Sequence, residues 1–400
     1  MIFSNFFMLT FYITAIMQYN QIMHFKFFNK AASLCLYMIA LNHITSAPAK
    51  AATLPQDNKK AVILTYHRIG EDSYPDSNIR IEQFNQQIEE LEKGGYNIIA
   101  LPELLDAIAN AKILPPKTIA ITLDGAYESA WKNAIPTLLD KDIPFTLFYA
   151  ANKADENAAG FMSWKQLKKL KNEKTVTLGV LPAYYNHTAH LSGSAILASL
   201  NKARSRHREY FGEEVKYIAY PHGETSNSLI KLTQSQGFTA GFTLRSGPYY
   251  PGIDLYDIPR FSITEDFADL ERFQRITNTL PLPMGDITPN DYDLSGVNTF
   301  MAGFTIPDAL APQIDSLNCF ISGYNEPLLN RLGTRIEIRL DGHEIGSRMR
   351  LNCTMPENAP RNENVLGSDE ALQWRWSGML FHKEQEESSP QEDELPALQE

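Results

Sequence analysis

Between residues 61 and 280, short apolar runs alternate with amphipathic segments, and this alternation limits the possible folds more than any other feature of the sequence. A short apolar run, such as residues 61–66, is typical of a buried strand. In residues 81–91 the apolar side chains recur every three or four positions, which predicts a helix that ends at the glycine pair 94–95. Strands that alternate with helices predict right-handed parallel β/α units, in a barrel or a doubly wound sheet.

The same alternation runs through the rest of this region. We predict further strands at residues 97–101, 118–123, 144–149 and 215–220, and further helices at residues 103–109, 127–139 and 192–210. The pattern continues through residues 164–170, 175–180, 226–236 and 238–243. In such folds the functional side chains lie at the carboxyl ends of the strands, so we look for chemistry there.

A second region follows a proline-rich connector at residues 280–289. It contains short β-like runs separated by turn residues, at 300–306, 317–322, 335–340, 348–354 and 373–381. These runs predict a small β-sandwich module over residues 285–383. Trp374 and Trp376 share one face of a strand, which favours packing between the two sheets over a platform for sugar rings. Residues 384–400 are acidic and poor in apolar side chains, so we expect a disordered tail.

The first 52 residues have the order of a secretory signal peptide. A short basic region starts at Met23, an apolar run follows at residues 31–41, and small residues end the segment. This apolar run is too short to span a bilayer as a helix. Residues 1–22 are also largely apolar, so either translation begins at Met23 or residues 1–45 anchor the protein in the membrane. We prefer export to the periplasm or the exterior, with cleavage near Ala52.

Export bears on the cysteines, because Cys35 would leave with the signal peptide and the mature chain would keep Cys319 and Cys353. In an oxidising compartment, two cysteines within β-like sequence predict a disulfide. Closing a loop of this size stabilises by about 3–4 kcal/mol in the chain-entropy model. If the protein stays in the cytoplasm, two buried free thiols are the better interpretation.

The composition excludes some classes of function. Hydrophobic residues at 44% and charged residues at 21% are ordinary globular values. A formal net charge of −11 argues against a protein that binds nucleic acid through bulk positive charge.

The most informative segment is Ile-Thr-Leu-Asp-Gly-Ala-Tyr at residues 121–127, where an apolar strand gives way to a helix. Asp124 would face the carboxyl edge of the sheet, where a carboxylate can act as a base or hold a metal. An aspartate at such a junction also often caps the helix. Neighbouring segments favour the chemical role, namely residues 61–70, 162–164, 176–179 and 217–223.

In order and spacing these segments resemble the NodB-homology polysaccharide deacetylases (carbohydrate esterase family 4), particularly the exported branch that acts on poly-N-acetylglucosamine. The resemblance covers residues 60–280. It implies a distorted (β/α) barrel that holds a divalent, zinc-like metal through one aspartate and two histidines. The metal activates a water that attacks an N-acetyl carbonyl, the acid before the ligand aspartate acts as the base, and a later histidine protonates the leaving amine.

The match to the family's metal ligands is incomplete. The family motif Thr-Phe-Asp-Asp-Gly-Tyr stands here as Thr-Leu-Asp-Gly-Ala-Tyr, so Asp124 takes the base position and Gly125 replaces the metal-binding aspartate. Leu181 and Tyr185 stand where the family has its two ligand histidines. Because a catalytic zinc usually needs three protein ligands, the missing ligands make a bound metal doubtful.

A third family motif appears as Ala-Tyr-Pro-His-Gly at residues 219–223, with Ala219 in place of the usual arginine. By resemblance, Arg260 supplies a positive group instead. The substrate-binding residues that the resemblance implies are Tyr127, Tyr220, Pro221, His222 and Arg260.

Alternatively, the metal site is kept but uses two histidine ligands at new positions in the chain. His187 and His190 have the i, i+3 spacing that places two rings on one side of a helical turn, and Asp124 would supply the carboxylate. The preferred interpretation is that both are loop histidines exposed to solvent, because such pairs are weak signals. His67, near another strand end, is expected to hydrogen-bond in the floor or rim of the barrel.

Different functions therefore remain open. The first is an exported hydrolase that removes N-acetyl groups from N-acetylhexosamine polymers of the chitooligosaccharide, peptidoglycan or poly-N-acetylglucosamine type, with Asp124 as base. The second is an inactive family member that binds glycan or a partner in the cell envelope. In a third, the β module binds the partner and the barrel is a scaffold. The modest charge of the middle of the chain suits a neutral polymer, and the oligomeric state is left open.

Overall fold

The computed structural model describes residues 53–184, 187, 191–297, 299–324, 328–340, 346–357 and 373–383. The predicted signal segment and acidic tail lie outside the described residues, as do Tyr185 and His190. Within the described residues, no helix is both long and apolar enough to cross a bilayer.

The first region is built on a curled parallel sheet. Its strands are β1 (Val62–Tyr66), β4 (Asn97–Ile98), β5 (Thr118–Asp124), β6 (Phe145–Tyr149), β7 (Val176–Val180), β8 (Tyr217–Ala219), β9 (Ala240–Phe242) and β10 (Phe261–Ser262). Their order is β10-β1-β5-β6-β7-β8-β9, with β4 also paired to β5. A short parallel pair, β2 (Arg68–Ile69) and β3 (Asn78–Ile79), stands beside this sheet.

The segment that contains β10 links the two ends of the strand order. Ile258 forms a parallel bridge to Phe242 in β9, and Phe261 pairs with Leu64 in β1. The sheet therefore curls into a distorted barrel with an irregular seam, which confirms the predicted (β/α) architecture.

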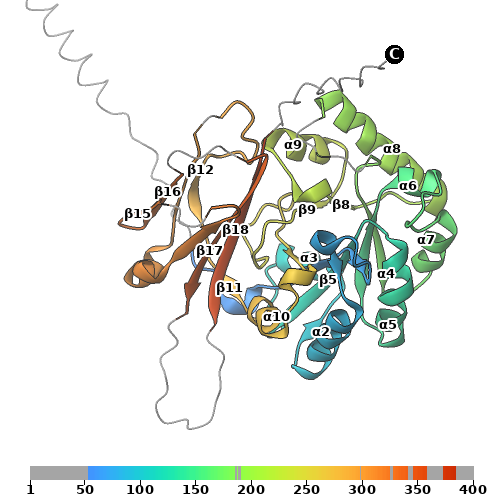
Figure 1. Ribbon diagram of the computed structural model, residues 1–400, viewed down its shortest axis with the longest axis horizontal. Coiled ribbons are helices and arrows are strands. Elements are labelled where there is room, and N and C mark those ends of the chain that lie inside the picture. Colours follow the sequence, from blue (N-terminus) through green and yellow to red (C-terminus); the bar gives the residue numbers. More distant parts are fainter. Residues whose placement is uncertain are drawn as a thin grey trace, which may run out of the picture. The chain divides into compact units, whose positions relative to one another are not determined.

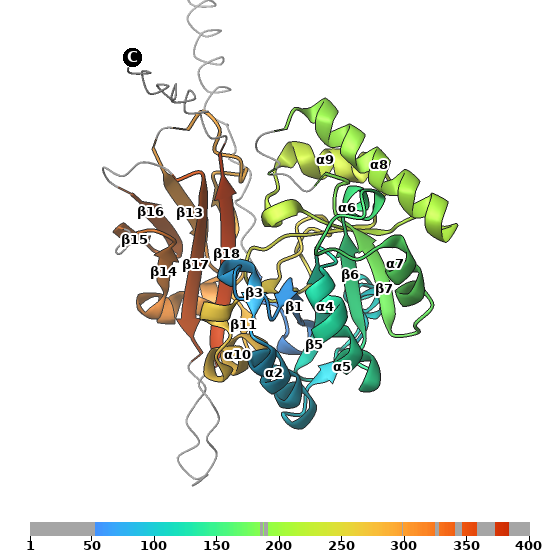
Figure 2. The ribbon, with the colours of Figure 1, turned by 45° about the vertical axis from the view of Figure 1, so that its right-hand side comes forward.

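Helices connect the strands and cover the outer side of the sheet (Figures 1 and 2). The α-helices are α2 (Ile81–Lys93), α3 (Leu101–Ala109), α4 (Glu128–Asn133), α5 (Ile135–Asp140), α6 (Ala151–Asp155), α7 (Trp164–Lys171), α8 (Gly193–Phe211), α9 (Asn227–Ser235) and α10 (Leu270–Thr277). Short 3₁₀ turns are η1 (Asp57–Lys59), η2 (Pro75–Ser77), η4 (Pro221–Gly223), η5 (Glu265–Phe267) and η6 (Asp308–Ser316).

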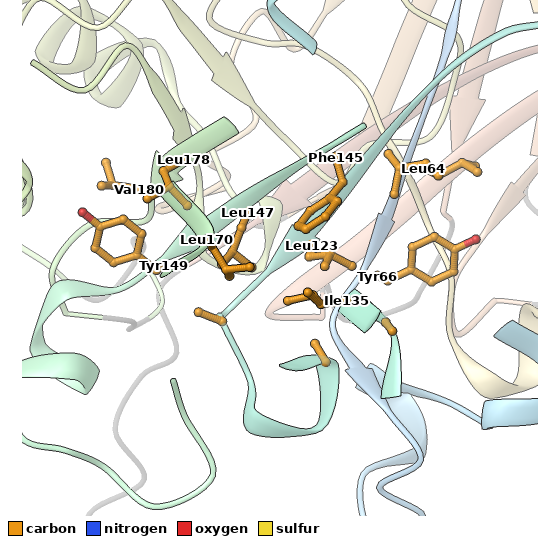
Figure 3. Close-up of a cluster of buried hydrophobic side chains, with 14 of the residues drawn as sticks. Leu64, Tyr66, Leu123, Ile135, Phe145, Leu147, Tyr149, Leu170, Leu178 and Val180 are labelled. Carbon is orange, nitrogen blue, oxygen red and sulfur yellow. The ribbon is translucent and has the colours of Figure 1, made fainter. Parts of the chain in front are cut away.

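The period of two along each strand sorts the barrel's side chains into two clusters. In β5, Ile121 and Leu123 join the outer cluster beneath the helices, whereas Ala120 joins the inner one. Figure 3 shows the outer cluster, where side chains of β1, β5, β6 and β7 meet Ile135 of α5 and Leu170 of α7. Fully burying one such Leu or Ile stabilises by about 1.5–3 kcal/mol. Asp124 continues the inner series at the carboxyl end of β5.

One predicted helix is wrong in its extent. The segment 127–139 forms two helices, α4 and α5, with Ala134 between them. Pro136 lies in the first turn of α5, and a proline there cannot donate the backbone hydrogen bond that a continuous helix would need.

In the part of the second region that the structure describes, two four-stranded sheets share a hydrophobic core, which confirms the predicted sandwich-like module. One sheet has the order β11-β18-β17-β14 and the other β12-β13-β16-β15. The strands are β11 (Leu280–Pro281), β12 (Gly285–Thr288), β13 (Met301–Thr305), β14 (Asn318–Ile321), β15 (Leu328–Leu332), β16 (Arg335–Arg339), β17 (Arg348–Pro356) and β18 (Trp374–His382). The predicted connector is therefore not a simple linker, because it supplies β11 to one sheet and β12 to the other.

The prediction that Trp376 packs between the two sheets is wrong. Its indole packs edge-on against Phe261 of the barrel, with ring centroids 5.4 Å apart, and its Nε1 donates to Ser246 Oγ at 3.0 Å. Met379 and Phe381, at odd positions of the same strand, fill the core between the sheets instead. The even-numbered face of β18 is turned toward the barrel.

A disulfide joins Cys319 of β14 to Cys353 of β17, which are directly opposite in register. The bond spans 34 residues, so reduction should lower the free energy of unfolding by about 3–4 kcal/mol in the chain-entropy model. We expect reductant to lower the melting temperature of the wild-type protein. A C319A/C353A variant should melt at a similarly lowered temperature, and reductant should not change that temperature further. Equal melting temperatures with and without reductant, together with two free thiols by mass spectrometry, would contradict this.

Candidate active site

The centre of the carboxyl edge of the sheet is a buried ion pair between Asp124 and Arg260. Arg260 is 0% exposed and Asp124 3%. Arg260 Nη1 donates to Asp124 Oδ1 and Nη2 donates to Oδ2, each at 2.7 Å, so the pair is bidentate. Arg260 also donates to Thr243 O at 3.0 Å and to the hydroxyls of Thr122 and Thr65. Such geometry gives each buried charge an opposite charge and hydrogen-bond partners.

His67 follows β1 directly and lies within electrostatic reach of this pair. Burial lowers its pKa to about 4, the charge of Asp124 acts in the opposite direction, and the charges of Arg260, Arg350 and Arg68 lower it further. The imidazole is therefore neutral near pH 7. Its Nδ1 is buried and has no hydrogen-bond partner among the described residues.

Tyr127 stands at the start of α4, beside Asp124. The Arg68 guanidinium lies 3.9 Å from the ring centroids of both Tyr127 and Tyr74, so it is held between the two rings. Arg68 also pairs with Glu71 at 2.5 Å. Tyr127 is thus one wall of an aromatic clamp around a cation.

A second polar cluster follows β8. His187 Nδ1 lies 2.8 Å from Glu224 Oε1, and because a carboxylate only accepts, Nδ1 carries the proton and donates. The His187 ring stacks on His222 with centroids 3.8 Å apart. Glu224 is 2% exposed and His187 45%, so a buried carboxylate orients an accessible imidazole. Burial lowers the pKa of His222 to about 4, and the neighbouring His187 lowers it too.

Of the other predicted substrate-binding residues, Pro221 is buried in η4 and begins the turn that carries His222. His222 has a φ of +55°, a left-handed conformation that is uncommon for residues other than glycine. Tyr220 lies in the outer hydrophobic cluster, and its hydroxyl donates to Tyr256 O at 2.9 Å. The structure therefore brings Tyr127 and Arg260 to Asp124, places His222 in the second cluster, and turns Tyr220 away.

The residues present do not fit the expected one-aspartate, two-histidine metal site. Gly125 has no side chain, Leu181 is 0% exposed in the inner apolar cluster, and both oxygens of Asp124 are engaged by Arg260. His187 is bonded to Glu224, and His190 lies outside the described residues. Over the described part of the chain, no three His, Cys, Asp or Glu side chains are grouped so that they could hold a metal ion.

Sequence reasoning missed three groups of this edge. Glu224 directly follows the Tyr-Pro-His-Gly motif, and that adjacency was the available signal. Arg348 and Arg350 come from β17 of the second module, and Arg348 Nη2 donates to His222 O at 2.6 Å. Their alternation with apolar residues marked one polar strand face, but nothing in the sequence indicated that this face meets the barrel.

Comparisons with known proteins agree with this architecture. A family model described as polysaccharide deacetylase matches residues 111–241. The poly-β-1,6-N-acetyl-D-glucosamine N-deacetylase of Staphylococcus epidermidis is 23% identical over 273 residues, which are 60% of this chain and 93% of that protein. The protein of the same name from Staphylococcus aureus is 25% identical over 251 residues, 56% of this chain and 86% of its own.

Two solved structures share the fold. The Streptococcus pyogenes deacetylase PplD in complex with acetate has a TM-score of 0.51 at 18% identity, covering 56% of this chain and 99% of that one. IcaB from Ammonifex degensii has a TM-score of 0.50 at 24% identity, covering 55% and 98%. The resemblance to polysaccharide deacetylases that the motifs predicted is confirmed.

The buried ion pair generates a stability prediction. Asp124→Asn leaves Arg260 charged and uncompensated, so we expect a loss of about 3–5 kcal/mol in the free energy of unfolding, measured by urea denaturation. The control is Arg275→Gln, which breaks an exposed i, i+4 pair with Glu271 and should cost under about 1 kcal/mol. Equal losses of unfolding free energy in the two variants would show that the buried ion pair stabilises the fold no more than an exposed one.

A second prediction concerns the position that the family gives to a metal ligand. Gly125 has a φ of +97°, and a Cβ built there would overlap the ring of Tyr127. Gly160 has a similar φ of +80° but nothing within 4 Å of its Cβ position. Gly160→Ala should therefore cost about 1 kcal/mol of backbone strain. Gly125→Ala should cost a further 1–3 kcal/mol or so from steric overlap.

Chemical denaturation of both alanine variants separates the two costs. Equal losses would mean that Tyr127 moves aside easily, and that position 125 could accept a side chain.

Proposed function

Since residues 111–241 match a polysaccharide deacetylase domain, we propose that this protein removes N-acetyl groups from N-acetylhexosamine polymers outside the cytoplasm. Relatives that act on poly-β-1,6-N-acetyl-D-glucosamine, by their names, support that polymer as the substrate class. The basic, apolar and small-residue order of residues 23–52 supports export. The observation that carries the proposal is the carboxyl group of Asp124, fixed at the carboxyl edge of the sheet by two hydrogen bonds from Arg260.

In the proposed reaction a water oxygen bonds to the acetyl carbon and the bond from that carbon to the sugar nitrogen breaks. Asp124 takes the proton from the water, and Arg260 fixes the orientation of the carboxylate for that step. The amine that leaves needs a proton in return. His187 is the donor that the geometry favours, because its ring is accessible and buried Glu224 accepts from Nδ1 and orients it. No step is assigned to a metal, because the residues in the ligand positions do not fit one.

A second candidate is a protein that binds the polymer without cleaving it. It is favoured by Leu181, an apolar side chain in a ligand position, and by the near-complete burial of Asp124. Such a protein would keep the carbohydrate-binding surface of the fold and lose turnover.

We expect the purified protein to release acetate from N-acetylglucosamine oligomers. Asp124→Asn should lower kcat about 10²–10⁴-fold, because it removes the proposed base. Acetate is measured per folded protein, with folding checked by circular dichroism. The matched control is Asp140→Asn at the exposed end of α5, which should keep the wild-type rate.

The wild-type protein alone decides between the two candidates. Binding of the oligomers without acetate release would contradict the deacetylase and support the non-catalytic candidate.

A further inference from the structure

Strand β17 of the second module has two faces of different chemistry. Met349, Leu351 and Cys353 point into the core between the two sheets. The alternating positions, Arg348, Arg350 and Asn352, are polar. A strand with one polar face commonly turns that face to solvent, but here it meets the barrel.

Each of these three polar side chains contacts a barrel segment that follows a strand end. Arg348 Nη2 donates to His222 O in η4, after β8. Arg350 Nη1 donates to Leu244 O at 3.0 Å, after β9, and Ser246 Oγ donates to Asn352 Oδ1. The face is therefore laid along the carboxyl edge of the barrel sheet, and the second module supplies part of the candidate site.

Several arginines at this edge have a carboxylate partner, whereas Arg350 of β17 has none among the described residues. Arg260 pairs with Asp124, Arg68 with Glu71, and Arg348 lies 3.8 Å from Glu224. Arg350 is partly buried, and no carboxylate of the described residues forms an ion pair with it. Burial lowers its pKa, as do the positive charges of Arg348 and Arg272. A guanidinium in this setting gains from an anion that enters from outside.

The position of Arg350 also links it to the proposed chemistry. Its charge acts on His67, as do the charges of Asp124 and Arg260, so Arg350 lies within electrostatic reach of the proposed reaction centre. A planar guanidinium matches a carboxylate through two parallel hydrogen bonds. One uncompensated guanidinium on β17 suits one negative charge.

We propose that Arg350 of β17 binds a sugar carboxylate, so that the polymer taken at this site carries hexuronate units beside its N-acetylhexosamines. This inference rests on the proposed N-acetylhexosamine polymer and selects, among such polymers, an acidic one over the neutral polymer that the relatives' names give. The β module then lines one side of the site and contributes to its substrate specificity. It is not a separate binding domain.

The test is calorimetric titration of the full chain with two ligands, of which one has the charged carboxylate and the other has it blocked. One is an oligosaccharide that alternates N-acetylhexosamine with hexuronate, and the other is its methyl ester. We expect the acid to bind about tenfold more tightly than the ester, the range for a hydrogen bond to a charged group. Arg350→Gln should abolish this preference. Arg339→Gln, on an exposed position of β16, should keep it.

Equal affinities for acid and ester would overturn the proposal, as would a preference that survives Arg350→Gln. If that variant does not fold, Arg350→Lys, which keeps the charge and loses the planar fork, should give an intermediate preference. Sodium acetate is titrated separately, and binding of acetate as tight as that of the acid would assign Arg350 to the small anion and overturn the polymer assignment. Acetate release is measured in the same samples, so a preference without turnover would refute the proposed hydrolase and leave this inference standing.

Discussion

The carboxyl edge of the barrel depends on one buried guanidinium. Arg260 donates to the carbonyl of Thr243 after β9, to the hydroxyl of Thr65 in β1, and to Thr122 and Asp124 in β5. It therefore ties together strands on both sides of the irregular seam. An isolated charge at 0% exposure would cost several kcal/mol, and Asp124 supplies the partner that offsets this cost. The same pair that closes the barrel engages the carboxylate that the chemistry needs.

Much of the fold could be predicted from periodicity, because each strand and helix of the barrel buries one regular set of apolar side chains. The sequence-based predictions fail where contacts between distant parts of the chain determine the structure. Residues 280–289 look like a linker, yet β11 in this segment pairs with β18, nearly a hundred residues away. Trp376 has the spacing of a buried residue. Its side chain packs against the barrel and not between the two sheets, because one face of β18 contacts the barrel.

The residues of the candidate site likewise include some that the sequence could predict and some that it could not. Asp124 could be found from its place at the end of an apolar strand, and Arg260 from the resemblance to a known family. The contributions of Arg348 and Arg350 could not, because they depend on how one face of β17 meets loops more than a hundred residues earlier in the chain. The absence of family ligands at Gly125 and Leu181 was visible in the sequence. The geometry adds the reason why no simple exchange restores them, since Leu181 is packed in the inner apolar cluster and Tyr127 occupies the space beside Gly125.

The central claim is that Asp124 serves as a carboxylate paired with Arg260 and is not part of a metal centre. Elemental analysis of the purified protein, with acetate release measured before and after exhaustive chelation, tests it most directly. We expect far less than one divalent metal per chain, and we expect chelation to leave the rate of acetate release from N-acetylglucosamine oligomers unchanged. One metal ion per chain, with activity lost on chelation and restored by zinc or cobalt, would contradict it.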